Sequence, residues 1–353
     1  MLEPFLPVRP ELTLVELLAY SLLSFLLCLA FTPSFVAFLH RHRLGKQLRV
    51  EAVDGGAVTF FRHYHQKKSG TPTMGGVLIW GSILLTIVLS RLLSYYGMVD
   101  HSLLSRGQVY VPLFTLVAFG VLGALDDYWG ISGWGKKRGL EVLPKVLVLL
   151  VVSVLGALWF HLKLGYDTVH VPFWGDVAFG WWYVPLFVLV LIATANAVNI
   201  TDGLDGLAGG LLVIAFGAFG VIAYLKGLFV LAGFCGVAVG ALAAFLWNNV
   251  PPALFFMGDT GSLALGGVLG VIALMTDQAL VLPLVGFVFV LETISVIVQL
   301  LSKKFRGGKK VFLSAPIHHH FEALGWGESK VTMRLWIVGA FTAFLGVVVG
   351  LLG

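Results

Sequence analysis

Residues 206–225 read GLAGGLLVIAFGAFGVIAYL, and residues 227–247, which follow the single charged residue Lys226, read GLFVLAGFCGVAVGALAAFLW. An α-helix needs about 20 mostly apolar residues to cross the hydrocarbon core of a bilayer, and each stretch provides them. The two stretches therefore predict a pair of membrane-spanning helices joined by a tight turn.

Eight more apolar stretches lie on both sides of this pair. They cover roughly 14–39, 74–96, 108–128, 142–162, 181–199, 261–278, 279–301 and 332–352. Only 12% of the 353 residues are charged, against about a quarter in soluble domains. We expect an all-α polytopic membrane protein of about ten transmembrane helices, forming one integral membrane domain over residues 1–353. The boundary near Asp277 is the least marked, because the eighth and ninth stretches adjoin there.

The basic residues predict the orientation of this bundle. Segments 40–73, 129–145 and 302–334 contain seven, four and seven of the 23 Lys and Arg residues, and all three lie on one side of a ten-helix arrangement. The positive-inside rule places that side in the cytoplasm and both termini in the periplasm. The net charge of +5 is then explained by loops beside anionic lipid, and a nucleic-acid partner is not expected.

Two smaller features complete the architecture. Residues 166–180 alternate around Gly175-Asp176, which predicts a small periplasmic hairpin between the fourth and fifth helices. The two cysteines, Cys28 and Cys235, lie inside apolar stretches and provide neither a disulfide framework nor a metal site.

Carboxylates from three separate parts of the chain fall on the cytoplasmic side. They are Asp126, Asp127, Asp202, Asp205 and Asp259. An Asp beside a helix end is often a cap, and this alternative is fair for Asp205, which precedes a Gly-rich helix. It is poor for Asp126 and Asp127, because adjacent carboxylates repel each other unless a cation offsets their charge.

A hard cation such as Mg²⁺ would offset this repulsion, since the ligands that it prefers are one or two carboxylates together with water and phosphate oxygens. The pattern indicates a metal site that handles phosphate, with a cation-coupled transporter as the alternative from another class. Glu292 lies deep in the stretch 279–301, and we interpret it as a packed structural carboxyl rather than a catalytic one.

Four polar segments accompany these acids. They are KKSGTPTMGG at 67–76, LDDY at 125–128, NAVNITDGLDGLA at 196–208, and FMGDTGS at 256–262 paired with APIHHHFE at 315–322. The three consecutive histidines are a poor zinc site, because adjacent side chains do not easily converge on one ion. Hydrogen bonding to phosphate is the better interpretation.

Taken together, these segments resemble the bacterial phospho-N-acetylmuramoyl-pentapeptide transferases, from about Leu14 to the last helix. The aspartates are shared with the wider superfamily of polyprenyl-phosphate N-acetylhexosamine-1-phosphate transferases. The segments APIHHH and GTPTMGG favour the muramoyl branch over a UDP-GlcNAc:undecaprenyl-phosphate GlcNAc-1-phosphate transferase, which is the alternative enzyme.

The resemblance implies transfer of phospho-MurNAc-pentapeptide from UDP-MurNAc-pentapeptide to undecaprenyl phosphate, which gives lipid I and UMP. It further implies Mg²⁺ as cofactor, a homodimer, and a place in the bacterial inner membrane with its active site on the cytoplasmic face. The catalytic loops would be about 40–73, 126–145, 199–206, 248–261 and 302–332. A basic residue that relatives often have three positions after the pair is Gly130 here, and Lys136, Lys137 or Arg138 would have to supply its charge.

The resemblance also assigns roles to individual residues. It implies catalytic roles for Asp126, Asp127, Asp259 and His318, with Asp259 and Asp127 as metal ligands. The substrate-binding residues that it implies are Lys68, Thr73, Asn199, Asp202, Gly203, Leu204, Asp205, Asn249, Phe256, Gln299, His319 and His320. We expect direct attack by the lipid phosphate, oriented or deprotonated by Asp126, and the rival is an aspartyl-phosphate intermediate.

Overall fold

The computed structural model describes residues 12–45, 70–104, 107–132 and 142–353, and it confirms the all-α fold. Its long helices are α1 (Leu14–Arg41), α3 (Gly76–Tyr95), α4 (Tyr110–Ser132), α5 (Val142–Leu158), α6 (Tyr183–Thr201), α7 (Leu207–Leu225), α8 (Phe229–Asn249), α9 (Asp259–Met275), α11 (Phe287–Phe305) and α13 (Glu328–Leu352). The short elements are α10 (Leu282–Val285), α12 (Ile317–Ala323) and the strands β1 (Thr168–Val171) and β2 (Gly175–Ala178).

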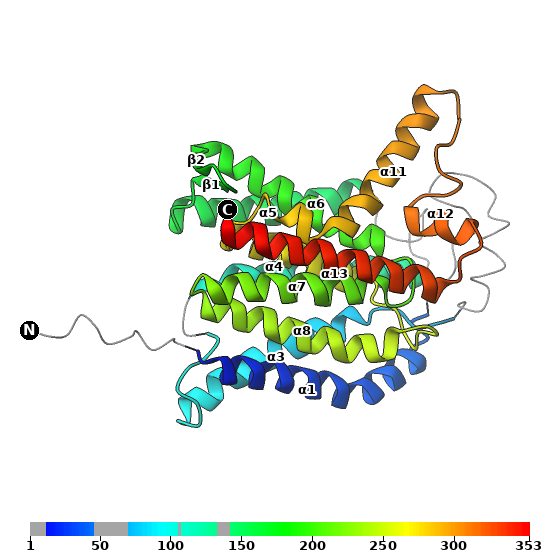
Figure 1. The fold of residues 1–353 in the computed structure, drawn as a ribbon. Helices are drawn as coiled ribbons and strands as arrows, with labels where there is room; N and C mark the ends of the chain where they lie inside the picture. The colour runs from blue at the N-terminus through cyan, green and yellow to red at the C-terminus, as the bar shows by residue number, and fades with distance from the viewer. Residues whose placement is uncertain (1–11, 46–69, 105–106, 133–141) are drawn as a thin grey trace, which may run out of the picture.

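Each of the ten predicted stretches overlaps one of the long helices. Within the described residues, eight helices are long and apolar enough to cross a membrane, and α9 is a shorter apolar helix of 17 residues. The expected ninth span, 279–301, begins too early, because Gly286 separates the single turn α10 from α11, which starts at Phe287. The boundary between the eighth and ninth stretches is marked by Asp277, which has a left-handed φ of 54°. The helix α11 then runs on to Phe305 and diverges from the bundle (Figure 1).

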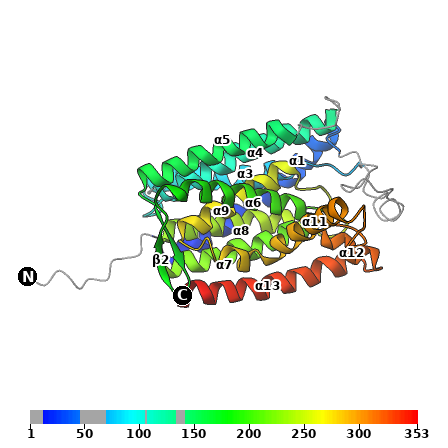
Figure 2. The ribbon, with the colours of Figure 1, turned by 90° about the horizontal axis from the view of Figure 1, so that it is seen from above.

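The helix α9 forms the centre of the bundle, because every residue from Thr260 to Met275 is buried. It packs against α4 and α6, and it also contacts α3 and α7; Figure 2 shows α9 inside the bundle. Two close approaches require glycine: a Cβ at Gly123 would lie 2.2 Å from the Asp259 carbonyl oxygen, and one at Gly76 would lie 2.1 Å from the Gly261 nitrogen. These glycines let α4 and α3 approach the first turn of α9 at backbone distance.

The predicted hairpin is present, but its turn is not where the sequence indicated. Val171 pairs with Gly175, so the turn is Pro172–Trp174, and Gly175-Asp176 belongs to β2. Phe173 adopts a φ of 66°, and the Trp174 N–H donates to the Val171 carbonyl oxygen at 3.0 Å to close the turn.

The hairpin and the carboxyl end of α13 lie at one end of the bundle, here called the hairpin end, as does the start of α1 (Figure 1). The Phe173 N–H donates to the carbonyl oxygen of Gly353, which fixes the hairpin to the end of α13. The opposite end, here called the site end, holds α12 together with the ends of α4, α6, α8 and α11 and the starts of α5, α7 and α9 (Figure 1).

Candidate active site

Three charged side chains from three helices meet at the site end. The Lys145 ammonium, in the first turn of α5, donates to Asp126 Oδ2 at 2.8 Å and to Asp259 Oδ2 at 2.5 Å. Asp126 lies near the end of α4, and Asp259 is the first residue of α9. The three side chains are 14–24% exposed, so the cluster is partly shielded from solvent. Two carboxylates therefore face one common cation position.

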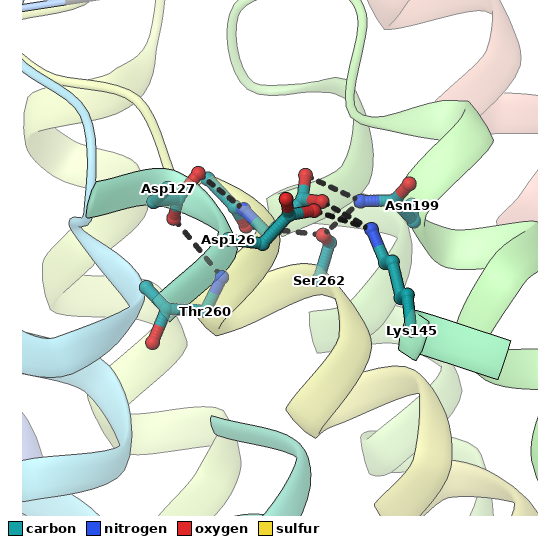
Figure 3. Close-up of polar contacts among 8 residues, drawn as sticks. Asp126, Asp127, Lys145, Asn199, Thr260 and Ser262 are labelled. Carbon is teal, nitrogen blue, oxygen red and sulfur yellow. Dashed lines mark hydrogen bonds and ion pairs between the residues drawn. The ribbon is translucent and has the colours of Figure 1, made fainter. Parts of the chain in front are cut away.

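Asn199 of α6 fixes the other oxygen of Asp259. Its amide nitrogen donates to Asp259 Oδ1 at 2.9 Å and to Ser262 Oγ at 2.8 Å (Figure 3). Asp259 is thus held between an amide and an ammonium, one on each oxygen. This arrangement orients the carboxylate before any ligand arrives.

Asp127 has a different environment from that of its neighbour Asp126. Its Oδ1 accepts the N–H of Asp259 and its Oδ2 accepts the N–H of Thr260, each at 3.1 Å (Figure 3). The N-cap residue Gly258 has no side chain with which to cap α9, so a carboxylate from α4 satisfies these first amides. Asp127 therefore fixes the helix that carries Asp259.

The segment before α3 lies beside this helix start. The Phe256 N–H donates to the Pro72 carbonyl and the Gly75 N–H donates to the Phe256 carbonyl, both at 2.8 Å. Thr73 is buried, and its Oγ1 would lie 2.8 Å from a Cβ at Gly258. Thr73 and Phe256 thus lie beside the start of α9. Lys68, together with Lys136, Lys137 and Arg138, lies outside the described residues.

Asp205 and Asn249 connect the α6–α7 turn to the loop after α8. Asp205 Oδ2 accepts the Ala253 N–H at 2.9 Å, while the Asn249 amide joins the Gly206 N–H to the Phe255 carbonyl. Asp205 is not the N-cap of α7, because Gly206 holds that position and α7 itself begins at Leu207. Both side chains shape the loop that leads to Asp259.

Each of the three histidines has its own partner at Nδ1. His318 meets Glu292 Oε2 at 3.0 Å, His319 meets Glu322 Oε2 at 2.7 Å, and His320 accepts the Leu313 N–H at 3.2 Å. The Nδ1 atoms of the three rings therefore meet three different groups.

The remaining predicted binding residues fall into two groups. Asp202 is the C-cap of α6, Gly203 comes next and packs against the His318 ring, and Leu204 is buried in the same turn. Gln299, by contrast, is buried and uses its amide on the backbone of Val311 and Phe312. It anchors the segment between α11 and α12.

Sequence reasoning missed Lys145, which was counted only among the basic loop residues. A signal was available: an ionisable residue inside an apolar helix needs a partner of opposite charge. Sequence reasoning also missed Ser262 and Thr260, whose small polar side chains gave no such signal.

The chemistry of this donor set fits a hard divalent cation. Mg²⁺ is satisfied by one or two carboxylates and takes its other ligands from water and phosphate. Asp126 and Asp259 share one cation position, which Lys145 fills here. Among the described residues, no group of three or more His, Cys, Asp or Glu could form a complete cage.

A polytopic α-helical bundle with aspartates, an asparagine and a lysine gathered at one end suits a membrane-embedded transferase of the glycosyl-phosphate type. Comparison with known proteins specifies the branch. Residues 109–277 match the model for glycosyl transferase family 4, and residues 68–79 match phospho-N-acetylmuramoyl-pentapeptide-transferase signature 1.

Curated relatives match over nearly their whole length. A phospho-N-acetylmuramoyl-pentapeptide-transferase of Chloroflexus aurantiacus is 39% identical, with 96% of this chain and 92% of the relative covered. The proteins of the same name from Halalkalibacterium halodurans and Geobacillus thermodenitrificans are 42% and 41% identical, over 94% and 96% of this chain and 96% and 98% of theirs. The chain belongs to the phospho-N-acetylmuramoyl-pentapeptide-transferase family.

Proposed function

We propose that this protein transfers phospho-MurNAc-pentapeptide from UDP-MurNAc-pentapeptide to undecaprenyl phosphate, with lipid I and UMP as products. An oxygen of the acceptor phosphate forms a bond to the sugar-bearing phosphorus of the donor, and the bond from that phosphorus to UMP breaks. The names of the relatives and the family signature support the donor, and the membrane-spanning bundle suits an acceptor with a long hydrocarbon tail.

The observation that carries the proposal is the shared cation position between Asp126 and Asp259. Asp259 would hold Mg²⁺ together with Asp126 or Asp127, and the geometry favours Asp126 because Asp127 serves two backbone amides. When bound, Mg²⁺ would neutralise negative charge on the donor diphosphate and on the departing UMP.

The protein's own residues prepare this site. Asn199 fixes one oxygen of Asp259 and leaves the other directed at the cation position. Lys145 offsets the repulsion between the two carboxylates. Its ammonium is also close enough to contact a phosphate oxygen bound at the shared cation position. The acceptor phosphate is largely ionised at neutral pH, so positioning by Asp126 matters more than proton removal. Direct attack therefore remains our preference over an aspartyl-phosphate.

Three further points belong to the same proposal. The site end would lie on the cytoplasmic face of the bacterial inner membrane, where a soluble donor and a membrane-held acceptor can reach one another. The basic loops at that end support this orientation. The resemblance to the family supports a homodimer.

The experiment is UMP release by the purified protein in detergent, with UDP-MurNAc-pentapeptide, undecaprenyl phosphate and Mg²⁺. We expect release that needs all three, and a fall of at least hundredfold in Asp259→Asn, because the variant loses the charge that holds the cation. Lys163→Met, an exposed change at the hairpin end, is the matched control with unchanged activity.

Other outcomes would contradict the proposal. Release that requires UDP-GlcNAc instead of UDP-MurNAc-pentapeptide would show that the protein is a GlcNAc-1-phosphate transferase. Cation-coupled flux across sealed vesicles without any UMP formation would show that it is a transporter. Phosphate trapped on an aspartate during a single turnover would overturn direct attack alone.

A further inference from the structure

Glu292 is a carboxylate placed where a membrane helix should be apolar. It lies in the second turn of α11, in the sequence FVFVLETISVIVQLL, and it is 0% exposed. A buried ionisable group in such a helix is costly, and it is usually paired and functional. A leucine at this position would pack without that cost, so packing alone does not account for Glu292.

Its partner is His318, the first of the three histidines, and this ring is also fully buried. Glu292 Oε2 lies 3.0 Å from His318 Nδ1, and it also accepts the backbone N–H of His318 at 3.4 Å. Because Oε2 already accepts from the backbone, it acts as the acceptor for the ring too. The proton of the neutral ring must then be on Nδ1, which leaves a lone pair on Nε2.

The other face of the ring meets the turn after α6. A Cβ at Gly203 would lie 2.4 Å from His318 Nε2, so only glycine leaves room for the ring in this position. Gly203 follows Asn199 by four residues, about one helical turn, and Asn199 holds Asp259. Within the described residues, Nε2 has no hydrogen-bond partner, although it is buried. A buried ring nitrogen without a partner, directed at the turn beside the carboxylate cluster, indicates that a ligand atom completes it.

We propose that Glu292 is a positioning residue for the transfer reaction: it fixes the tautomer and orientation of His318, so that the Nε2 lone pair is presented at the Asp202–Gly203 turn and accepts a hydrogen bond from a hydroxyl of the donor nucleotide sugar. This inference rests on the proposed function for its substrate, but the pairing itself does not depend on it. It revises the interpretation of Glu292 as a structural carboxyl.

The first test is a double-mutant cycle with Glu292→Gln and His318→Gln. Glutamine keeps the size of Glu292 but loses its charge, and its amide can either accept or donate, so it no longer fixes the tautomer. We expect Glu292→Gln to lower kcat at least tenfold with the KM for the donor changed less than threefold. In the His318→Gln background the same change should alter kcat less than twofold, because its effect acts through the ring.

Two matched variants separate this role from a packing defect. Glu292→Asp keeps the charge, and it should retain several times more activity than Glu292→Gln. Ser295→Ala removes a buried hydroxyl that donates to the Glu292 carbonyl at 2.6 Å, and it should leave kcat within twofold. Effects of Glu292→Gln and His318→Gln that multiply independently would overturn the positioning role.

The second test needs no substrate, which keeps it separate from the proposed function. Imidazole ¹⁵N shifts of histidine-labelled protein, assigned to His318 by loss of its signals in His318→Gln, report which ring nitrogen carries the proton. We expect Nδ1–H in the wild type and a mixture of tautomers in Glu292→Gln. An Nε2–H tautomer in the wild type would overturn the inference, whereas Nδ1–H in a protein that releases no UMP would overturn only the proposed function.

Discussion

Lys145 determines the charge balance of the candidate site, because it contacts both Asp126 and Asp259. Lys145→Met should lower the rate of UMP release at least hundredfold and the free energy of unfolding by about 2 kcal/mol. This loss is smaller than the roughly 3–5 kcal/mol lost when one partner of a fully buried ion pair is removed, because these side chains remain partly exposed to solvent. Thermal unfolding in detergent and the UMP assay measure both effects.

Magnesium gives this prediction a second readout. If Lys145 and Mg²⁺ occupy the same cation position, added Mg²⁺ should raise the unfolding temperature of Lys145→Met more than that of the wild type. Lys163→Met, on the turn that follows α5, is the control for loss of a lysine without these partners. An equal response to Mg²⁺ in all three proteins would contradict a shared cation position.

At this scale the sequence predicted that acids from separate parts of the chain lie at one end of the bundle, but not what each one contacts. The meeting of Asp126 and Asp259 follows from placing helix ends on one membrane face, and the structure brings them together. Asp127 could not be told from Asp126, because the difference depends on which backbone amides each carboxylate reaches. The pairing of Lys145 with Asp259 could not be predicted, because a contact across 114 residues leaves no local pattern.

The start of α9 is the element on which the site is built. Its first amides are satisfied by Asp127 of α4, and Gly123 lets the backbone of α4 lie close to that of Asp259. Asp127→Asn offers one acceptor in place of two and removes a negative charge from a helix N-terminus. We expect a loss of about 1–2 kcal/mol of stability, measured by thermal unfolding, together with reduced activity.

The Mg²⁺ dependence of the remaining activity distinguishes a positioning role of Asp127 from metal ligation. For a residue that only fixes α9, the Mg²⁺ concentration at half-maximal activity should stay within threefold of the wild type. A tenfold increase would instead make Asp127 a metal ligand, as the family resemblance implies. Ser132→Ala, an exposed change at the end of the same helix, controls for disturbance of α4.

Most elements could be predicted because a membrane span is a long and uniform signal. The stretches 206–225 and 227–247 correspond closely to α7 and α8. The break in 279–301 was missed because Gly286 interrupts the helix without any change in hydropathy. The hairpin turn was misplaced because Phe173, an uncommon residue for a left-handed φ, takes that conformation in place of a glycine.

For the whole molecule, the hairpin and the site end lie on opposite ends of the bundle (Figure 1), so one orientation in the membrane decides where both face. From the basic residues of its loops, we expect the site end to face the cytoplasm. The hairpin end is consistent with an interfacial position, since Trp174, Trp181 and Trp182 are 65–85% exposed there. Exposed tryptophans of this kind favour the boundary between lipid and water.

Cysteine labelling in intact cells tests this orientation with little background, because Cys28 and Cys235 are both 0% exposed. Trp174→Cys places a thiol on the exposed hairpin, and Lys309→Cys places one on the exposed segment after α11. A membrane-impermeant maleimide should label Trp174→Cys from outside, and it should label Lys309→Cys only after the inner membrane is opened. The reverse pattern would place the carboxylates on the periplasmic face, where a soluble cytoplasmic donor could not reach Asp259. The proposed reaction and the proposed orientation therefore depend on each other, and this experiment would contradict both if the hairpin proved to be inside.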